Sequence, residues 1–326
     1  MPQSDAIASA LPSQRPKAFR HEAVFYRGEP DFVPAVLPFV AVAVERDEPV
    51  LVAGVPARAE ALRSELGRAA VRVEFVDMQS AGRNPARIIP VWNDFVCRHA
   101  ASGKALNGVG EPIWAGRTPQ EVAECQRHES LLNLAFAEAG PFALICPYDE
   151  AGLPPAVVAA ARESHPHVVE AGKREVSSCY QGATGIEWSD RRPLPAAPEH
   201  LPAQTFSAAD IAPVRREVEA WAIAHGVEPA RAADLALAVH EAAANSIRHG
   251  GGGGVLRSWT ADDAAVCEIA DAGALCDPLV GRSLPPPLSV GGRGMWLINH
   301  LCDLVQVRMT AAGTVVRMHQ RLGPAA

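Results

Sequence analysis

The chain has 326 residues, of which 48% are hydrophobic and 21% charged, and these values exclude wholesale disorder, collagen and coiled-coil structures. Thirty basic and 37 acidic side chains give a formal net charge of −7, so no basic surface indicates DNA or RNA as a direct partner. At roughly 100–200 residues per domain, this length predicts two domains.

The sequence also indicates the compartment. Its first residues are polar, with no apolar run behind a basic segment, so we expect no signal peptide. No stretch approaches about 18 uninterrupted apolar residues, so we expect no membrane partner. The seven cysteines are scattered without a CxxC pair, which is typical of reduced thiols in a cytoplasmic protein.

Short apolar runs alternate with segments of helical length between residues 18 and 180, after a tail at 1–17 that we expect to be disordered. Because the runs are apolar on both faces, they predict a three-layer α/β domain with a mostly parallel sheet. The expected strands are Ala23–Tyr26, Val50–Ala53, Val71–Val76 and Phe142–Cys146, and the expected helices are Phe32–Arg46, Ala57–Leu66, Ala86–Ala100 and Pro119–Ala139.

Residues 181–203 contain four prolines and no hydrophobic periodicity, which predicts an interdomain linker. From 204 to 322, helices and antiparallel strands are grouped, as in an α+β sandwich of helices on one sheet. Here we expect helices over 207–226, 229–249 and Gly294–Cys302, and strands over Val255–Thr260, Ala265–Ala270, Leu304–Thr310 and Thr314–Leu322.

The helix over 229–249 carries the first candidate site residues. Glu241 and Asn245 lie one turn apart, on the side opposite its apolar stripe. A carboxylate and an amide in this arrangement suit the activation of a hydroxyl and the binding of a hard cation beside phosphate. For this helix alone, a solvated polar face is the more common explanation.

Two glycine motifs and a threonine strengthen the functional interpretation. Asp271-Ala-Gly273 ends an apolar strand, where a flat ligand can approach the backbone closely. Gly291-Gly292-Arg293-Gly294 opens an apolar helix, whose free backbone N–H groups suit phosphate oxygens. Thr314 follows a glycine on the last strand. Each motif alone is weak evidence, but their order along the chain is far more specific.

Residues 206–322 resemble the GHKL (histidine-kinase-like) ATPase superfamily, which implies its Bergerat α+β fold. Glu241-Ala-Ala-Ala-Asn245 is similar to the N box, and the two glycine motifs to the two glycine boxes. The segments HEAAANSIRHG and GGRGMWLINHLCDLVQVR are most similar to anti-sigma-factor serine kinases. No helix with a phosphoacceptor histidine precedes them, unlike in ordinary sensor kinases.

The resemblance implies a role for each matching residue, with ATP and Mg²⁺ as cofactors. Asn245 would ligate Mg²⁺, and Glu241 would be the general base for a hydroxyl of a protein substrate. Asp271 would bind the adenine amino group near Thr314, and Gly273 would let the base approach. The phosphates would lie against Gly292, Arg293 and Gly294. Leu275 departs from the DxGxG pattern of many relatives, which puts fast phosphotransfer in doubt more than ATP binding.

Residues 18–180 resemble the MEDS sensory domain in the segments HEAVFY, GEPIWAGR, HESLLNLAF and CPYD. The resemblance implies a RecA-like fold that senses a small ligand. Residues 53–57 lack the GK[ST] of a P-loop, so we expect no nucleotide hydrolysis there. Candidate ligand contacts are Trp92, Trp114, His128, Glu129 and Tyr148. A metal or redox site at Cys97, His99, Cys125 and His128 is also open, although their spacing matches no standard zinc pattern.

The two resemblances together imply a cytoplasmic regulatory switch. Its ATPase domain would bind ATP–Mg²⁺, sequester a sigma factor and phosphorylate a serine or threonine of an anti-anti-sigma (antagonist) protein, while an unknown small ligand tunes the N-terminal domain. A homodimer is compatible with this interpretation. The alternative is an ATP-binding interaction module without kinase activity. A ligand-binding transcription regulator is disfavoured by the negative charge and the missing helix-turn-helix.

Overall fold

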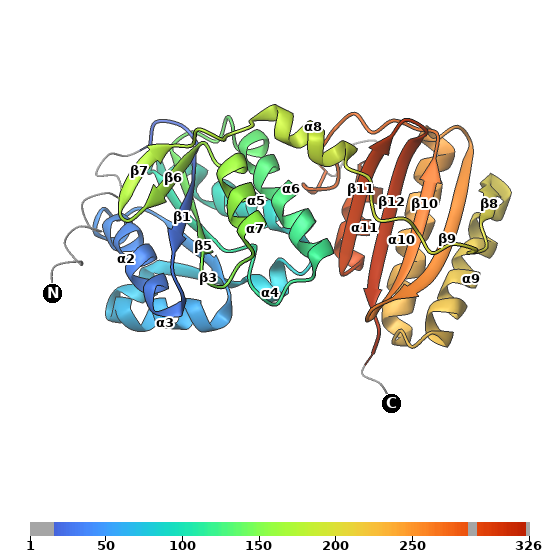
Figure 1. Ribbon diagram of the computed structural model, residues 1–326, viewed down its shortest axis with the longest axis horizontal. Coiled ribbons are helices and arrows are strands. Elements are labelled where there is room, and N and C mark those ends of the chain that lie inside the picture. Colours follow the sequence, from blue (N-terminus) through green and yellow to red (C-terminus); the bar gives the residue numbers. More distant parts are fainter. Residues whose placement is uncertain (1–15, 286–291, 324–326) are drawn as a thin grey trace. The chain divides into compact units, whose positions relative to one another are not determined.

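The computed structural model describes residues 16–285 and 292–323, without the side chains of Trp188, Ser189 and Arg191. The chain divides into two compact units between Ile186 and Glu187 (Figure 1). Each unit has its own sheet, the first mostly parallel and the second antiparallel. The expected α/β and α+β pair of domains is therefore confirmed at this level. Most of the tail expected at 1–17 lies outside the described residues.

The first unit contains a seven-stranded sheet with the order β3-β2-β4-β5-β1-β6-β7. All neighbouring strands are parallel except β6 and β7. Its strands are β1 (Arg20–Tyr26), β2 (Val50–Gly54), β3 (Val73–Asp77), β4 (Leu106–Gly110), β5 (Phe142–Asp149), β6 (His167–Glu170) and β7 (Lys173–Val176).

Helices cover both faces of this sheet (Figure 1). Tyr26 on β1 packs against Phe32 of α2, whereas Phe142 on β5 packs against Phe136 and against Trp92 of α5 on the other side. The helices are α2 (Glu29–Glu45), α3 (Pro56–Leu66), α4 (Met78–Ala81), α5 (Ile88–His99), α6 (Pro119–Ala135) and α7 (Pro155–Ser164), with 3-10 helices η1 (Gly67–Arg72), η2 (Pro85–Arg87) and η3 (Ala100–Ser102).

The structure corrects several sequence predictions in and after this unit. The strand expected from Val71 begins only at Val73, because Val71 lies in η1 and is 89% exposed. Strand β4 and helix α7 were not predicted. The expected linker is not irregular throughout, since helix α8 (Ala183–Arg191) occupies its first part.

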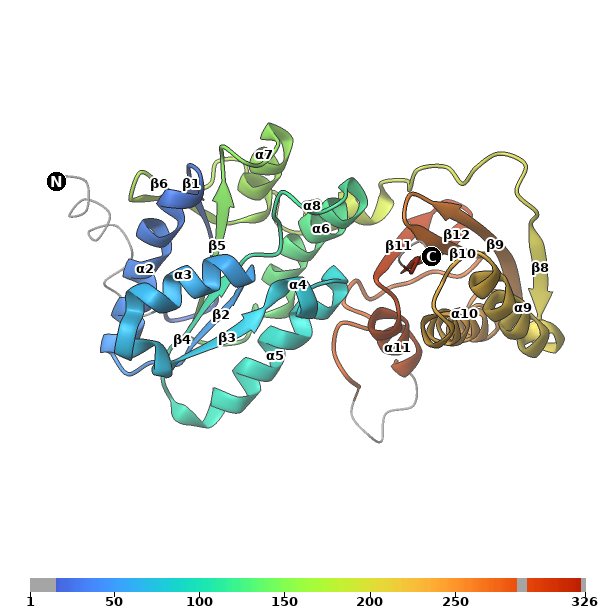
Figure 2. The same ribbon diagram turned by 90° about the horizontal axis from the view of Figure 1, so that it is seen from below.

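The second unit is a five-stranded sheet with the order β11-β12-β10-β9-β8. Helices lie on one face of this sheet (Figure 2). The strands are β8 (Gln204–Ser207), β9 (Gly253–Ala261), β10 (Ala264–Asp271), β11 (Leu304–Thr310) and β12 (Gly313–Arg321), and the helices are η4 (Ala208–Asp210), α9 (Ile211–Ala224), α10 (Pro229–His249) and α11 (Arg293–Leu301).

Helix α10 is the central helix of this unit. The Glu228 side chain caps its N-terminus by accepting from the backbone N–H of Arg231, and Pro229 occupies the first turn, where its missing N–H costs nothing. Leu235 and Val239 are fully buried on its apolar face. With this face fixed against the sheet, Glu241 and Asn245 of α10 lie beside the first turn of α11.

Among the described residues, no helix has the length and apolar character needed to cross a membrane.

Candidate functional site

A cavity of about 230 Å³ lies in the second unit, between α10, the end of β10, the start of α11 and strand β12. Both polar residues, such as Asn245 and Asp271, and apolar residues, such as Val280, Met295 and Val316, line it. The lining residues are Ala242, Asn245, His249, Gly250, Asp271, Gly273, Ala274, Leu275, Val280, Gly292, Gly294, Met295, Val307, Thr314 and Val316.

Glu241 and Asn245 meet the first turn of α11 beside this cavity. A methyl group added to Gly294 would lie 3.0 Å from Glu241 Oε2 and 3.2 Å from Asn245 Nδ2. The missing side chain of Gly294 therefore lets the carboxylate and the amide approach the helix start. Gly292 is the N-cap of α11 with a φ of 83°, a left-handed conformation that favours glycine.

Asp271 also lines the cavity, at the last position of β10. Its Oδ2 accepts a 2.6 Å hydrogen bond from Ser246 Oγ on α10, and its Oδ1 accepts from the backbone N–H of Gly273 at 2.8 Å. Each oxygen keeps a free lone pair. The carboxylate is thus held in one orientation and can still accept from a ligand's N–H.

Strand β12 places Thr314 beside this carboxylate. Thr314 pairs in register with Asp271, and its hydroxyl donates to the carbonyl of Gly273 at 2.8 Å. A methyl group on the preceding Gly313 would lie 1.9 Å from the Asp271 carbonyl oxygen. Only glycine fits there, which explains why a glycine precedes Thr314.

The structure brings most of the predicted residues of this half into one cavity. Asn245, Asp271, Gly273, Gly292, Gly294 and Thr314 line it, and Glu241 adjoins it through Gly294. Arg293 is exposed at the start of α11. Leu275, the departure from the expected pattern, also lines the cavity. Gly291 lies outside the described residues.

This arrangement provides two different environments for one ligand. Amide and carboxylate oxygens at the start of α11 suit a hard cation, and the free N–H groups of the helix suit phosphate. The apolar walls and the oriented Asp271 suit a flat base that carries an amino group.

Comparison with known families agrees with this geometry. Residues 205–320 match the model of the histidine kinase-like ATPase domain, and residues 20–166 match the model of the MEDS domain, the methanogen/methylotroph DcmR sensory domain. The chain combines a MEDS domain with a histidine-kinase-like ATPase domain. Both expected resemblances are thereby confirmed, and the pairing indicates an ATP-binding regulatory protein.

No curated protein matches the chain. Among solved structures, the ATP synthase subunit NeqB from Nanoarcheaum equitans aligns with 12% identity and a TM-score of 0.36. That alignment covers 73% of this chain and 66% of the subunit, just under two thirds of its length.

The MEDS domain separates most of the residues that the sequence analysis singled out there. Trp92 is buried in the core and fills the space beside Gly108 and Gly110 of β4, and Trp114 stacks on Arg117, whose guanidinium carbon lies 3.9 Å from the ring centroid. Both tryptophans therefore have structural roles that explain their positions.

The cysteine and histidine set proposed as a metal or redox option does not form one cluster. Cys97 is exposed, whereas Cys125 is buried and donates to the carbonyl of Pro112 at 3.2 Å. Burial raises the pKa of the Cys125 thiol to about 12, so this thiol stays protonated. His99 contacts Glu74 at 2.9 Å, and His128 is buried on α6.

Glu129 and Tyr148 do come together, through a 2.9 Å hydrogen bond from the Tyr148 hydroxyl to Glu129 Oε1. Around the other oxygen of Glu129 lie three side chains that sequence reasoning missed: His21, Cys146 and His165. His21, Glu129 and Cys146 occur in the segments that carry the MEDS resemblance, which was the available signal.

Proposed function

We propose that the ATPase domain binds ATP with Mg²⁺ in the Bergerat manner and phosphorylates a serine or threonine of an antagonist protein, as anti-sigma-factor kinases do. In this proposal the protein also sequesters a sigma factor in the cytoplasm, alone or as a homodimer. The RecA-like MEDS domain shifts the balance between the two activities when its ligand binds.

One observation carries the proposal: Glu241 and Asn245 lie together at the first turn of α11, and Asn245 lines the same cavity as Asp271. With the base at Asp271, the triphosphate would extend toward Gly292 and Gly294. Asn245 would then hold the cation between phosphates, and Glu241 would accept the proton of the attacking hydroxyl. Catalysis would rest on positioning and charge neutralisation, as phosphoryl transfer generally does.

Leu275 favours the second candidate, an ATP-binding interaction module without kinase activity. Its side chain lines the cavity at the position where many relatives have a glycine. A bulky residue there restricts the segment that has to close over the phosphates, so nucleotide binding would persist without transfer.

Radiolabelled ATP separates the two candidates. The full chain is incubated with labelled ATP, Mg²⁺ and an antagonist protein encoded beside it, and label on the antagonist is measured together with nucleotide binding. Transfer that Asn245→Ala abolishes, and that Glu219→Gln on α9 leaves unchanged, supports the kinase. Binding without transfer supports the module, and absence of both would contradict the two proposals.

A further inference from the structure

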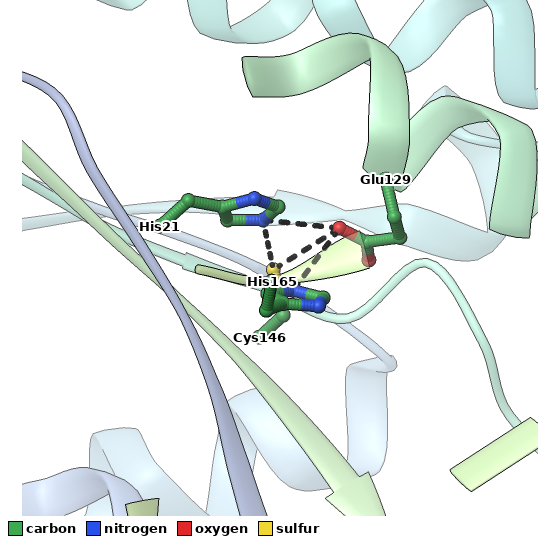
Figure 3. Close-up of side chains that lie close together, drawn as sticks. All are labelled: His21, Glu129, Cys146 and His165. Carbon is green, nitrogen blue, oxygen red and sulfur yellow. Dashed lines mark hydrogen bonds and ion pairs between the residues drawn. The ribbon is translucent and has the colours of Figure 1, made fainter. Parts of the chain in front are cut away.

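Four potential metal ligands converge in the interior of the MEDS domain (Figure 3). His21 comes from β1, Cys146 from the neighbouring strand β5, Glu129 from α6, and His165 from the residue that ends α7. Each of them is at most 1% exposed. We refer to these four residues as the His-Glu-Cys-His cluster.

Four of the six distances between their ligand atoms are those of a tetrahedron around one ion, and all six are at most 4.8 Å. Glu129 Oε2 lies 3.1 Å from His21 Nε2, 3.4 Å from His165 Nε2 and 3.6 Å from Cys146 Sγ, and Cys146 Sγ lies 3.4 Å from His21 Nε2. In a tetrahedral zinc site, bond lengths of about 2.0–2.3 Å separate neighbouring ligands by about 3.3–3.6 Å.

Hydrogen bonds to residues outside the cluster fix which ring nitrogen of each histidine faces the other ligands. The amide nitrogen of Asn133 donates to the Ser164 carbonyl at 2.8 Å, so its oxygen faces His21 and accepts from Nδ1 at 3.1 Å. His165 Nδ1 donates to the Ala161 carbonyl at 2.7 Å. Both Nε2 atoms are thereby directed inward. Such outer hydrogen bonds are the usual support of metal-binding histidines.

With both imidazoles neutral, the cluster has fewer protons than its facing acceptors need, so it requires either one added proton or a cation. With both Nδ1 atoms protonated, the two neutral imidazoles present Nε2 lone pairs to the carboxylate of Glu129. Only the single S–H of Cys146 can donate among the four groups. His165 Nε2 has no hydrogen-bond partner among the described residues. Two imidazolium ions would repel each other, because the ring centroids of His21 and His165 are 4.0 Å apart.

We propose that the His-Glu-Cys-His cluster binds one divalent transition-metal ion, with Zn²⁺ as the preferred ion. Imidazole nitrogen, thiolate and carboxylate are the ligand types that zinc takes. On binding, the Cys146 thiol releases its proton to solvent, and the thiolate and the Glu129 carboxylate together balance the two positive charges of the ion. The protein fills all four positions, so the site is of the closed, structural type, and the ion would tie β1, β5, α6 and the end of α7 together.

Metal content and cobalt spectroscopy test this proposal. The full chain, prepared without a histidine tag, is stripped with a chelator and reloaded with Zn²⁺ or Co²⁺. We expect about one ion per chain, release of one proton on binding, a fall in melting temperature on stripping, and the intense visible bands of tetrahedral Co²⁺ with a thiolate-to-cobalt charge-transfer band. Absence of bound metal would mean that protons hold the cluster and would overturn the proposal, as would an octahedral cobalt spectrum without the sulfur band.

Matched variants assign the site. Cys146→Ser should remove the charge-transfer band and weaken Zn²⁺ binding by more than the roughly 10–100-fold that loss of an outer contact costs. Cys125→Ser, which removes a buried thiol from the same domain, should leave the spectrum unchanged. Equal loss in both variants would contradict the assignment. Should Cys146→Ser fail to fold, the cobalt spectrum of the wild-type chain still shows whether a tetrahedral ion with a sulfur ligand is bound.

Discussion

The hydroxyl of Ser246 donates a 2.6 Å hydrogen bond to Asp271 Oδ2 and so joins helix α10 to the end of strand β10. Helix α10 also carries Asn245, which lines the same cavity. One rigid element therefore sets the distance between the residue proposed to bind the base and the residue proposed to bind the cation. Orientation that exists before the ligand arrives lowers the entropy cost of binding.

Ser246→Ala should weaken ATP binding without removing it. A hydrogen bond to a partly solvated group contributes about 1 kcal/mol, so we expect roughly a fivefold rise in the dissociation constant and a similar loss in the free energy of unfolding. Calorimetric titration measures the first and urea unfolding the second. Ser258→Ala on β9 removes a hydroxyl outside the cavity and serves as the control. Unchanged ATP affinity in Ser246→Ala would show that the orientation of Asp271 plays no part in binding the base.

Asn245→Ala should reduce nucleotide binding mainly when Mg²⁺ is present. The amide oxygen is a neutral ligand for a hard cation, and alanine removes it without adding charge beside the phosphates. Titrations of the full chain with ATP in Mg²⁺ and in chelator measure this difference. An equal loss of affinity in both conditions would show that Asn245 acts on the nucleotide and not through the ion.

Glu241→Gln should slow phosphate transfer by about 10²–10⁴-fold, because general-base assistance is worth about that factor. ATP affinity should change little, since glutamine keeps the shape of the side chain beside Gly294. The initial rate of antagonist phosphorylation and the dissociation constant of ATP are measured on the same preparation. Transfer at the wild-type rate would remove Glu241 from the reaction.

Asn133→Leu should weaken Zn²⁺ binding to the His-Glu-Cys-His cluster by about 10–100-fold, because it removes the acceptor that orients the His21 ring. Chelator competition measures the affinity, and Gln126→Leu on the same helix is the control. A metal affinity that both substitutions leave unchanged would show that Asn133 has no part in the site.

His319 on β12 should make the ATPase domain less stable in mild acid. Burial, with a smaller contribution from the Arg317 charge, lowers its pKa from 6.5 to about 4. The unfolded chain takes up this proton below about pH 6.5 and the folded chain only near pH 4, so stability falls as the pH falls between these values, by up to about 3 kcal/mol.

The variant His319→Gln isolates that contribution. It keeps a group that can donate to Gln306, whose Oε1 lies 3.1 Å from His319 Nε2, but it does not titrate. The stability advantage of the wild type at pH 7.5 should therefore shrink by about 2 kcal/mol at pH 5. Urea unfolding of both proteins at the two pH values measures the change, and parallel pH profiles would contradict the prediction.

Sequence patterns predicted the helices and strands whose ends and buried faces are determined by residues within the same segment. Helix α10 begins at Pro229 and ends at His249 as expected, because its cap, its apolar stripe and its terminal glycines all lie within one segment. Strand β4 was missed because it contains Gly108 and Gly110, and the rings that cover these glycines come from Trp92. That contact depends on tertiary packing, which no local pattern contains.

The two candidate sites differ in the same way. Glu241 and Asn245 are one helical turn apart, so their juxtaposition can be read from the chain. His21 and Cys146 are 125 residues apart, and only the pairing of β1 with β5 brings them together. No spacing rule for zinc motifs applies across such a separation.

The position of β1 has a consequence for how the protein is made. This strand leaves the ribosome before its partners in the sheet, β5 and β6, which are synthesised more than 100 residues later. At about 5–20 residues per second, the 125 residues that separate His21 from Cys146 take about 6–25 s to translate. During that time an apolar strand destined for the middle of the sheet has no native strand beside it. The nascent chain is therefore open to mispairing and to chaperone binding until the strand around Cys146 emerges.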